Sequence, residues 1–300
     1  MDTYYFYTEG LTVGYHGVPL IKDIRISLKK GEILTLIGPN GAGKTTLLSA
    51  LTAQMPVDAG TVTYGGAPVW ENEAVLGELC FSRELGSTVG GMNNALKVKD
   101  YLNAGRLFYP HWDEAYAQKL ITQFKLAPKK KISALSKGMA SMLTIVLALA
   151  SRAPITFMDE PVAGLDVVAR EDFYRLLLDD YAETGRTFVI STHILEEASN
   201  VFEKVLIMKE GRLIEACDAD ELLAQFCAVT GRDDVVNKAC AGLNILHTET
   251  LGRQKSCVVR VPAETMAAKG LDVDCTSLPL QKVFVALCGH EQELQEHREG

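Results

Sequence analysis

The amino-acid sequence predicts an α/β fold in which helices cover both faces of a largely parallel β-sheet. A glycine-rich loop joins the strand-like run 33–37 to the helix-like run 47–51, and strands and helices alternate again from Ile155 onward. About 110 residues separate the loop from the strand that begins at Ile155, although a strand–helix–strand crossover needs only about 30. We therefore expect a helical subdomain, at about residues 90–150, inserted into the sheet domain.

The elements before and within the insertion follow from local pattern. Residues 4–30 alternate in polarity and turn like short strands. The helix after the glycine-rich loop should end near Gln54, because Pro56 comes soon after it. Residues 61–64 alternate like a further strand. Within 98–150, leucine and phenylalanine recur at helical spacing, which predicts helices with one buried face.

The elements after the insertion are predicted in the same way. They are an apolar strand with an acidic end at 155–160, a helix at 167–182, a strand at 187–191, a helix at 194–202 and a hairpin of 205–208 with 212–214. Around Ala219 the pattern changes to a helix-like piece, a strand-like run and an apolar helix, at 221–226, 257–261 and 283–287. We therefore expect a sheet domain at 1–218, followed at 219–300 by a small C-terminal α+β accessory domain with a charged tail.

Bulk properties exclude several classes of protein. The formal net charge of -8 disfavours a general attraction to nucleic acid, so we expect no nucleic-acid partner. The seven cysteines show no C-x-x-C spacing, which indicates free thiols in a reducing compartment. The N-terminus lacks the features of a secretory signal, and the most apolar run, Met142–Ala150, is too short to span a bilayer. We expect a soluble, cytoplasmic protein that reaches a membrane only through a partner.

The glycine-rich loop matches the pattern G-x-x-x-x-G-K-[ST] between a strand and a helix. Its residues are Gly38, Pro39, Asn40, Gly41, Ala42, Gly43, Lys44, Thr45 and Thr46. Glycines let the backbone bend so that successive N–H groups face one anion, and the N-terminus of the next helix favours negative charge. Lys44 can reach the β- and γ-phosphates, and the Thr45 hydroxyl can ligate Mg²⁺. The loop therefore predicts that the chain binds a nucleoside triphosphate.

Three further groups could act on that nucleotide. Asp159 and Glu160 end an apolar strand, where one carboxylate can hold Mg²⁺ and the other can orient or deprotonate the attacking water. His193 closes a buried strand and can donate to a phosphate oxygen, although a packed histidine is the plainer interpretation. Ser136 fits a helix N-cap; alternatively, its hydroxyl and the Gly138 N–H face an anion.

Taken in order, the motifs resemble those of the ATP-binding cassette (ABC) ATPases over about residues 3–217. The motifs are Gly38–Thr46, Leu135–Met139, Asp159–Pro161, Ala163–Asp166 and Ser191–His193. The chain looks most similar to stand-alone cassette subunits of bacterial ABC transporters, a group that includes antimicrobial-peptide and lantibiotic exporters. Residues 277–289 also resemble the end of many such chains. The resemblance implies a P-loop NTPase sheet with an inserted helical subdomain.

The resemblance implies roles for single residues. Tyr15 would stack on adenine, and the loop Gly38–Thr46 would hold the phosphates of ATP. Thr45 and Asp159 would organise Mg²⁺. The catalytic residues would be Glu160, as the carboxylate that acts on water, with Lys44 and His193 at the γ-phosphate.

The resemblance also implies a second subunit. Ser136 and Gly138 would complete the nucleotide site of another cassette, so hydrolysis would occur in a head-to-tail pair. Asp166 would lie at the interface of that pair. One chain supplies half of each composite site, and the partner cassette could be a copy of this chain or a different one.

The sequence departs from the family pattern in two places. Lys137 and Met139 replace a Gly and the Gln of the usual Leu-Ser-Gly-Gly-Gln signature. The family also places a Gln after the strand that follows the phosphate-loop helix, where it contacts Mg²⁺ and couples to the membrane domain. No Gln lies between Gln54 and Gln118. The residues at the matching place, one of which must serve if the contact is kept, are Ser82, Arg83 and Glu84.

The resemblance thus implies an ATPase subunit that drives a separate membrane permease, as an exporter, from the cytoplasmic face of the membrane. Two alternatives stay open. The departures also fit a nucleotide-gated sensor or binding module with little turnover. The other alternative is a soluble ABC ATPase of translation or DNA maintenance; such proteins usually carry two cassettes or a long coiled-coil insertion, and the acidic charge disfavours nucleic acid.

Overall fold

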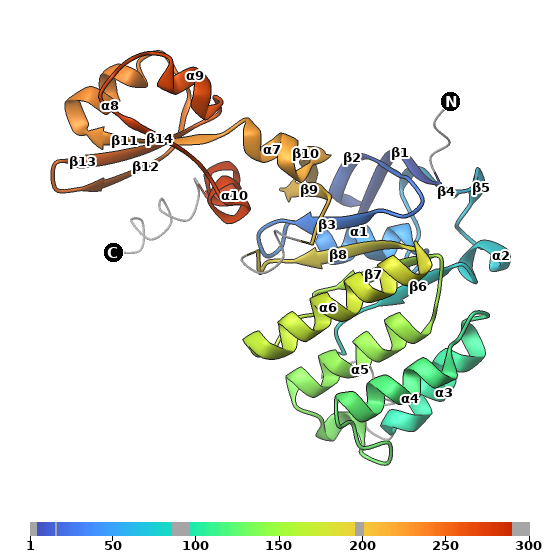
Figure 1. Cartoon of the computed structure of the whole chain (residues 1–300). Coiled ribbons are helices and arrows are strands. Elements are labelled where there is room, and N and C mark those ends of the chain that lie inside the picture. The colour runs from blue at the N-terminus through green and yellow to red at the C-terminus, as the bar shows by residue number, and fades with distance from the viewer. Residues whose placement is uncertain (1–4, 16, 86–95, 196–200, 290–300) are drawn as a thin grey trace. The chain divides into compact units, whose positions relative to one another are not determined.

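The computed structural model describes residues 5–15, 17–85, 96–195 and 201–289. The chain folds into two compact units, Met1–Ala216 and Cys217–Gly300 (Figure 1). Among the described residues, no helix has both the length and the apolar character needed to cross a bilayer.

The first unit contains two β-sheets. Its strands are β1 (Phe6–Tyr15), β2 (Val18–Leu28), β3 (Ile33–Ile37), β4 (Ala59–Tyr64), β5 (Ala67–Pro68), β6 (Leu79–Ser82), β7 (Ile155–Asp159), β8 (Thr187–Thr192), β9 (Lys204–Lys209) and β10 (Arg212–Asp218). The larger sheet has the order β10-β9-β3-β8-β7-β6, and its strands from β9 to β6 run parallel. This confirms the predicted parallel sheet. The smaller sheet has the order β2-β1-β4-β5 and is antiparallel.

Helices cover both faces of the larger sheet. They are α1 (Lys44–Leu51), α2 (Glu73–Leu76), α3 (Val98–Phe108), α4 (Glu114–Gln123), α5 (Lys137–Ala150) and α6 (Val167–Thr184), with a 3-10 turn at Ile132–Ala134. Figure 1 shows α5 and α6 on one face of the sheet, with α3 and α4 beyond α5. On the opposite face, α1 packs between the larger and the smaller sheet within one shared hydrophobic cluster.

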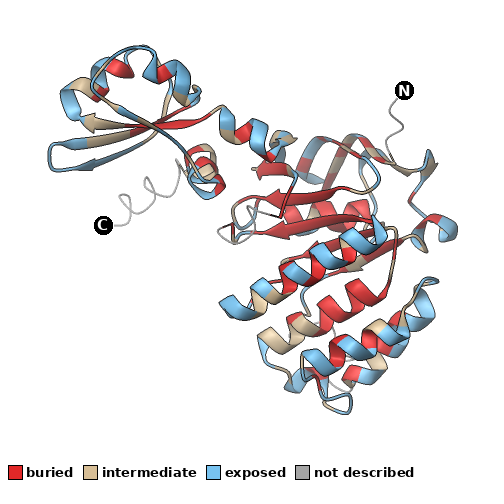
Figure 2. Cartoon of the chain, viewed as in Figure 1, coloured by how far each residue is buried: buried red, intermediate tan, exposed pale blue. Residues whose placement is uncertain are grey.

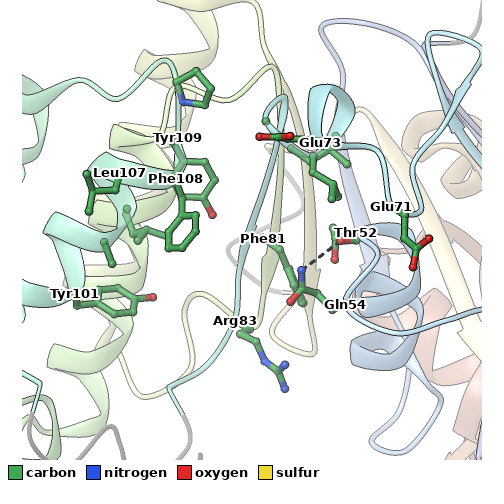
Figure 3. Close-up of a pocket in the computed structure, with 17 residues that line it drawn as sticks. Thr52, Gln54, Glu71, Glu73, Phe81, Arg83, Tyr101, Leu107, Phe108 and Tyr109 are labelled. Atoms are coloured by element: carbon green, nitrogen blue, oxygen red, sulfur yellow. Dashed lines mark hydrogen bonds between the residues drawn. The ribbon is translucent and has the colours of Figure 1, made fainter.

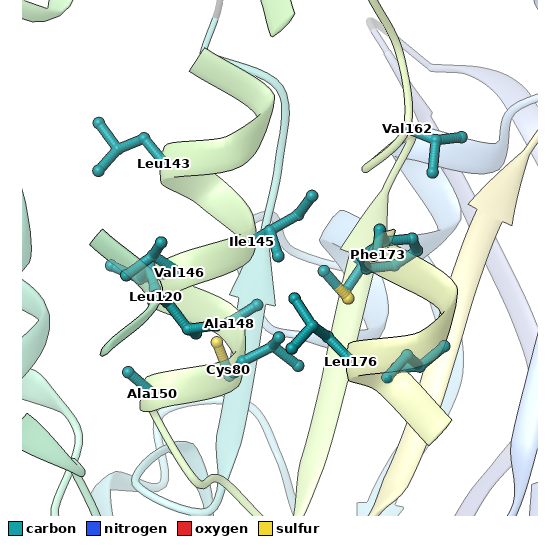
Figure 4. Close-up of a cluster of buried hydrophobic side chains, with 14 of the residues drawn as sticks. Cys80, Leu120, Leu143, Ile145, Val146, Ala148, Ala150, Val162, Phe173 and Leu176 are labelled. Carbon is teal, nitrogen blue, oxygen red and sulfur yellow. The ribbon is translucent and has the colours of Figure 1, made fainter. Parts of the chain in front are cut away.

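The two faces of β3 show how the sequence builds these layers. Successive side chains of a strand point to opposite faces, so Leu34 and Leu36 pack with α1 while Ile33 joins the cluster under α5 and α6. The strand is fully buried (Figure 2), which is why its sequence is apolar apart from Thr35, whose hydroxyl donates to the Ile190 carbonyl oxygen. Figure 4 shows the second cluster, where α5 side chains such as Ile145 face Phe173 and Leu176 of α6.

Several predicted elements differ from the structure. Residues 4–30 were predicted to form short strands, but β1 and β2 have 10 and 11 residues and pair along most of their length. Glycine and proline interrupt the alternation of polar and apolar residues, but the strands continue. The pairing of β1 with β2 accommodates the interruptions by shifts in register, one of them between Val13 and Gly14. Helix α1 ends at Leu51, before the predicted Gln54. The helix predicted at 194–202 falls mainly on residues outside the described part of the chain.

The second unit contains an antiparallel sheet of order β12-β13-β11-β14. Its elements are α7 (Ala219–Ala224), β11 (Cys227–Arg232), α8 (Asp233–Ala239), β12 (Ile245–Leu251), β13 (Gln254–Val259), α9 (Ala263–Ala267), β14 (Asp274–Ser277) and α10 (Leu280–Cys288). From β11 to β14 this is a β-α-β-β-α-β unit of the split βαβ type. Its core joins Val229 and Val259 of the sheet to Val236 of α8 and Met266 of α9.

Candidate functional site

The phosphate loop connects β3 to α1 and is held in shape by its glycines. Gly41 and Gly43 have φ angles of 79° and 102°, in the left-handed region that glycine adopts without strain. At Gly38, a Cβ atom would lie 2.4 Å from the Met208 carbonyl oxygen, so the next strand allows no side chain there. The glycines of the motif are therefore required by the backbone path.

Lys44 begins α1 and folds back over the loop. Its Nζ donates to the carbonyl oxygens of Gly38 at 2.7 Å and Pro39 at 3.3 Å, and lies 3.8 Å from Oε1 of Glu160. The side chain is 7% exposed. A buried ammonium group needs such partners, since its charge is costly without them. The arrangement presents one positive charge inside the loop.

Asp159 is fixed by two hydroxyl groups at the end of β7. Thr45 Oγ1 donates to Asp159 Oδ2 at 2.7 Å, and Ser191 Oγ donates to Oδ1 at 2.5 Å. Ser191 stands directly opposite Asp159 in the parallel pairing of β7 with β8. The carboxylate is buried, with each oxygen accepting a hydrogen bond. Ser191 lies within the Ser191–His193 motif, but its place in the sequence does not predict this role.

Glu160 follows Asp159 in an unusual backbone conformation. Its φ angle is 49°, which costs about 1–3 kcal/mol for a residue with a side chain and is typical of functional sites. The Glu160 N–H donates to both the carbonyl oxygen and Oγ of Ser191, at 3.1 and 3.0 Å. Its carboxylate lies between two basic side chains, with Oε2 2.7 Å from His193 Nδ1 and Oε1 3.8 Å from Lys44 Nζ.

The N-terminus of α5 lies against a different loop. Ser136 is the N-cap of this helix and accepts from the Met139 N–H at 3.2 Å, as the plainer interpretation of this residue predicted. A Cβ atom on Gly138 would lie 2.7 Å from the Gly164 carbonyl oxygen, so the two segments touch through their backbones. In the part of the chain that the structure describes, no hydrogen bond or ion pair joins Ser136 or Gly138 to Lys44 or Glu160.

The remaining predicted site residues, Tyr15 and Asp166, make other contacts. Tyr15 ends β1 with 54% of its surface exposed, and its hydroxyl is 3.9 Å from Met55 Sδ. Asp166 caps α6 by accepting from the Ala169 N–H at 2.9 Å. An exposed aromatic ring is free to stack on a flat ligand.

The residues at the place of the missing Gln have three different partners. Ser82 is buried and donates to the Thr144 carbonyl oxygen at 2.9 Å. The Arg83 guanidinium lies 6.0 Å from the centre of the Phe81 ring. Glu84 Oε1 lies 3.1 Å from Lys137 Nζ. The hydroxyl of Ser82 is therefore already engaged, and only Arg83 and Glu84 reach the surface.

A cavity of about 990 Å³ lies beside these residues, between α3 and the end of β6 (Figure 3). Tyr101, Leu107 and Phe108 line one side of it, and Gln54 and Arg83 line the other. Leu107 and Phe108 are 81% and 77% exposed. Large exposed apolar side chains beside a cavity mark a surface that suits a protein partner.

Sequence comparison relates the chain to transport proteins. The family model described as ABC transporter matches residues 21–163. The ABC transporter ATP-binding protein YtrB of Bacillus subtilis is 28% identical over 81% of this chain and 82% of its own length. The Hemin import ATP-binding protein HmuV of Streptomyces coelicolor is 32% identical, over 72% of this chain and 79% of its own. The Nod factor export ATP-binding protein I of Burkholderia lata is 30% identical, over 91% and 93%.

Solved structures show the same fold. One described as the ATP binding subunit of an ABC transporter superposes with a TM-score of 0.64 and 24% identity, over 73% of this chain and 92% of that one. Another, described as a dimeric post-hydrolysis state of an ATP-binding cassette bound to ADP and Pi, superposes with a TM-score of 0.61 and 20% identity, over 71% and 98%.

Proposed function

This chain belongs to the ABC transporter family as an ATP-binding, ATP-hydrolysing subunit, and we propose that it drives a separate membrane permease that exports its substrate. The observation that carries the proposal is the single group formed by Lys44, Asp159, Glu160 and His193 around the phosphate loop. A triphosphate needs positive charge at its phosphates and a carboxylate near the attacking water, and this group supplies both.

Each residue of the group has a proposed task. The loop Gly38–Thr46 and Lys44 would hold the phosphates, and Glu160 would orient the water and accept its proton. His193, whose Nδ1 lies 2.7 Å from Glu160 Oε2, would donate to the γ-phosphate. Tyr15 would stack on the adenine ring.

The oxygen atoms beside the loop fit Mg²⁺. The Thr45 hydroxyl and the Asp159 carboxylate meet at 2.7 Å, and hydroxyl and carboxylate oxygens are the ligands that this hard cation prefers. Thr45 and Asp159 would hold the ion together with phosphate oxygens. The bound cation would neutralise part of the phosphate charge.

A second cassette is part of the proposal. Ser136 and Gly138 are not joined to the Lys44 group within the described chain, so they would serve the nucleotide of a partner, with Asp166 at the interface. A solved cassette of the same fold is described as a dimer bound to ADP and Pi. The partner would be a copy of this chain or a different cassette.

We place the permease at the cavity between α3 and β6. Its exposed Leu107 and Phe108 would bury apolar surface against a segment of the permease, and Arg83 would contact a polar or acidic group of that segment. The chain would then lie at the cytoplasmic face of the membrane through this partner. Export is favoured because the Nod factor export relative matches 91% of the chain, whereas the hemin import relative matches 72%.

A nucleotide-gated sensor with little turnover is the second candidate. The replacement of signature residues by Lys137 and Met139 and the absence of the Gln after β6 favour it. A soluble role in translation or DNA maintenance has no comparable support, since the relatives described above are named for transport.

The experiment that separates the two candidates measures ATP turnover and mass in solution of the 300-residue chain, with and without Mg-ATP. Slow hydrolysis by the wild type, together with an ATP-dependent dimer when Glu160→Gln blocks turnover, supports the transport ATPase. Tight ATP binding without turnover, alone or with a permease, supports the sensor.

A further inference from the structure

The Lys137 side chain joins three segments of the first unit. Lys137 is the first residue of α5, next to its N-cap Ser136. Its stem runs along the backbone of Gly164, where a Cβ atom would come within 2.6 Å of Lys137 Cγ and 3.0 Å of its Cβ and Cδ. Its ammonium group lies 3.1 Å from Glu84 Oε1, in the segment after β6. One of the two signature departures, Lys137, therefore forms an ion pair with a residue at the place of the missing Gln.

Its position makes Lys137 a cation that needs an anion. The N-terminus of a helix is the positive end of the dipole, so a lysine in the first turn is disfavoured there unless negative charge is nearby. Glu84 is the anion that the folded chain provides. The stem rests on Gly164, and the side chain, which lies between Ser136 and Gly138 in the sequence, is 61% exposed.

We propose that Lys137 is a phosphate ligand which this chain presents to the nucleotide of a second cassette, and that Glu84 holds it until that nucleotide arrives. The inference rests on the proposed function, in which Ser136 and Gly138 face the γ-phosphate across the interface. It takes the second cassette to be another copy of this chain. The ligand class is a nucleoside triphosphate, whose terminal phosphate carries the charge that exchanges with the Glu84 carboxylate.

The exchange is feasible because the resting pair is weak. The Lys137 and Glu84 side chains are 61% and 47% exposed, and ion pairs this exposed contribute little to stability. A phosphate group offers more charge and more acceptor oxygens than one carboxylate, and charge-assisted bonds to it are among the stronger ones. Breaking the Lys137–Glu84 ion pair therefore costs little free energy, so the lysine can exchange the carboxylate for a phosphate.

Release of Glu84 would also affect the segment after β6, which contains Arg83 and Glu84. Glu84 follows Arg83, which lines the cavity where we place the permease. Nucleotide binding across the interface would free this segment from α5. The ion pair thus replaces, in this chain, part of the link that the missing Gln provides in the family.

The test measures dimerisation of the full chain against ATP concentration, in a Glu160→Gln background that suppresses turnover. Lys137→Gln should raise the ATP concentration at half-maximal dimer by about ten-fold or more, the size of a lost charged hydrogen bond. Lys137→Arg should stay within about three-fold, because it keeps the charge. Glu84→Gln should lower the midpoint by about two- to five-fold, the size of an exposed ion pair.

The matched control is Lys129→Gln, an exposed lysine of the same charge that lies before the 3-10 turn. It should leave the midpoint unchanged, and thermal melting should show that all variants fold. If Lys137→Gln behaves like Lys129→Gln, the inference is overturned while the proposed function stands. If the Glu160→Gln chain binds ATP but never dimerises, pairing of two copies is overturned, and the inference falls with it.

Discussion

Thr45 and Asp159 are 114 positions apart in the sequence and are joined by a hydrogen bond of 2.7 Å. The bond connects the first turn of α1 to the end of β7, across the whole inserted helical segment. Ser191 binds the other carboxylate oxygen from β8, so three elements converge on one buried acid. This convergence is what the parallel order β3-β8-β7 provides, since it brings the carboxyl ends of the strands to one edge.

We expect Glu160→Gln to bind ATP as the wild type does but to lower turnover by about 10²- to 10⁴-fold, the usual range for a general base. The amide keeps the size of the side chain while it loses the ability to take a proton. ATP turnover under saturating nucleotide and binding of a fluorescent ATP analogue measure the two effects. Glu171→Gln, an exposed residue of α6, is the control and should change neither. Near-wild-type hydrolysis in Glu160→Gln would remove Glu160 from this role.

Ser191→Ala should weaken the site through its neighbours. The Ser191 hydroxyl donates to Asp159 and accepts from the Glu160 N–H, so its loss leaves a buried carboxylate oxygen and the Glu160 backbone less well held. We expect a loss of about 1–3 kcal/mol in the free energy of unfolding, and a higher Mg²⁺ concentration for half-maximal turnover. Urea unfolding and Mg²⁺ titration of turnover measure these. An unchanged Mg²⁺ dependence would show that Ser191 does not act through Asp159.

Breaking a buried ion network should destabilise the first unit strongly. Arg186 binds Asp180 at 2.6 and 3.0 Å and also donates to the Leu149 carbonyl oxygen at the end of α5, while Arg152 donates to Asp180 at 2.9 Å. Asp180→Asn leaves two arginines without their shared carboxylate, which should cost about 3–5 kcal/mol.

The control for this prediction is the neighbouring residue. Asp179 lies on the same helix but is exposed, and Asp179→Asn should cost less than about 0.5 kcal/mol. Both variants are compared with the wild type by urea unfolding. Equal midpoints for the two variants would show that the buried network contributes nothing beyond an ordinary surface charge.

The sequence predicted those parts of the site that are contiguous in the chain. The phosphate loop could be recognised because strand, glycines and helix follow one another directly, and Asp159 and Glu160 because they end an apolar run. The role of Ser191 could not, because it depends on its register opposite Asp159. The left-handed conformation of Glu160 and the Glu84–Lys137 pair likewise arise from packing between segments far apart in the sequence.

The fold shows the same limit. The strands around the loop are buried on both faces and read as apolar runs, so their prediction was confirmed. In the second unit, β12 is partly or fully exposed along its length and β14 has four residues with no fully buried side chain. Such strands carry little hydrophobic pattern, so they could not be predicted from the sequence.

The free energy of unfolding should decrease as the pH is lowered, and Asp113 should account for part of this decrease. The Tyr116 backbone N–H, and to a lesser degree Arg152, hold the pKa of the Asp113 carboxyl below its usual range, while partial burial works against them. A carboxyl whose pKa is lower when folded contributes stability above its unfolded pKa, near 3.9, and loses it as the pH falls through the folded value.

Asp113→Asn keeps the cap on α4 but not the charge, so the wild type should be more stable by up to about 1 kcal/mol at pH 7. That difference should shrink below about pH 4, as measured by urea unfolding at each pH. A difference that is constant from pH 7 to pH 3 would mean that the charge of Asp113 plays no part.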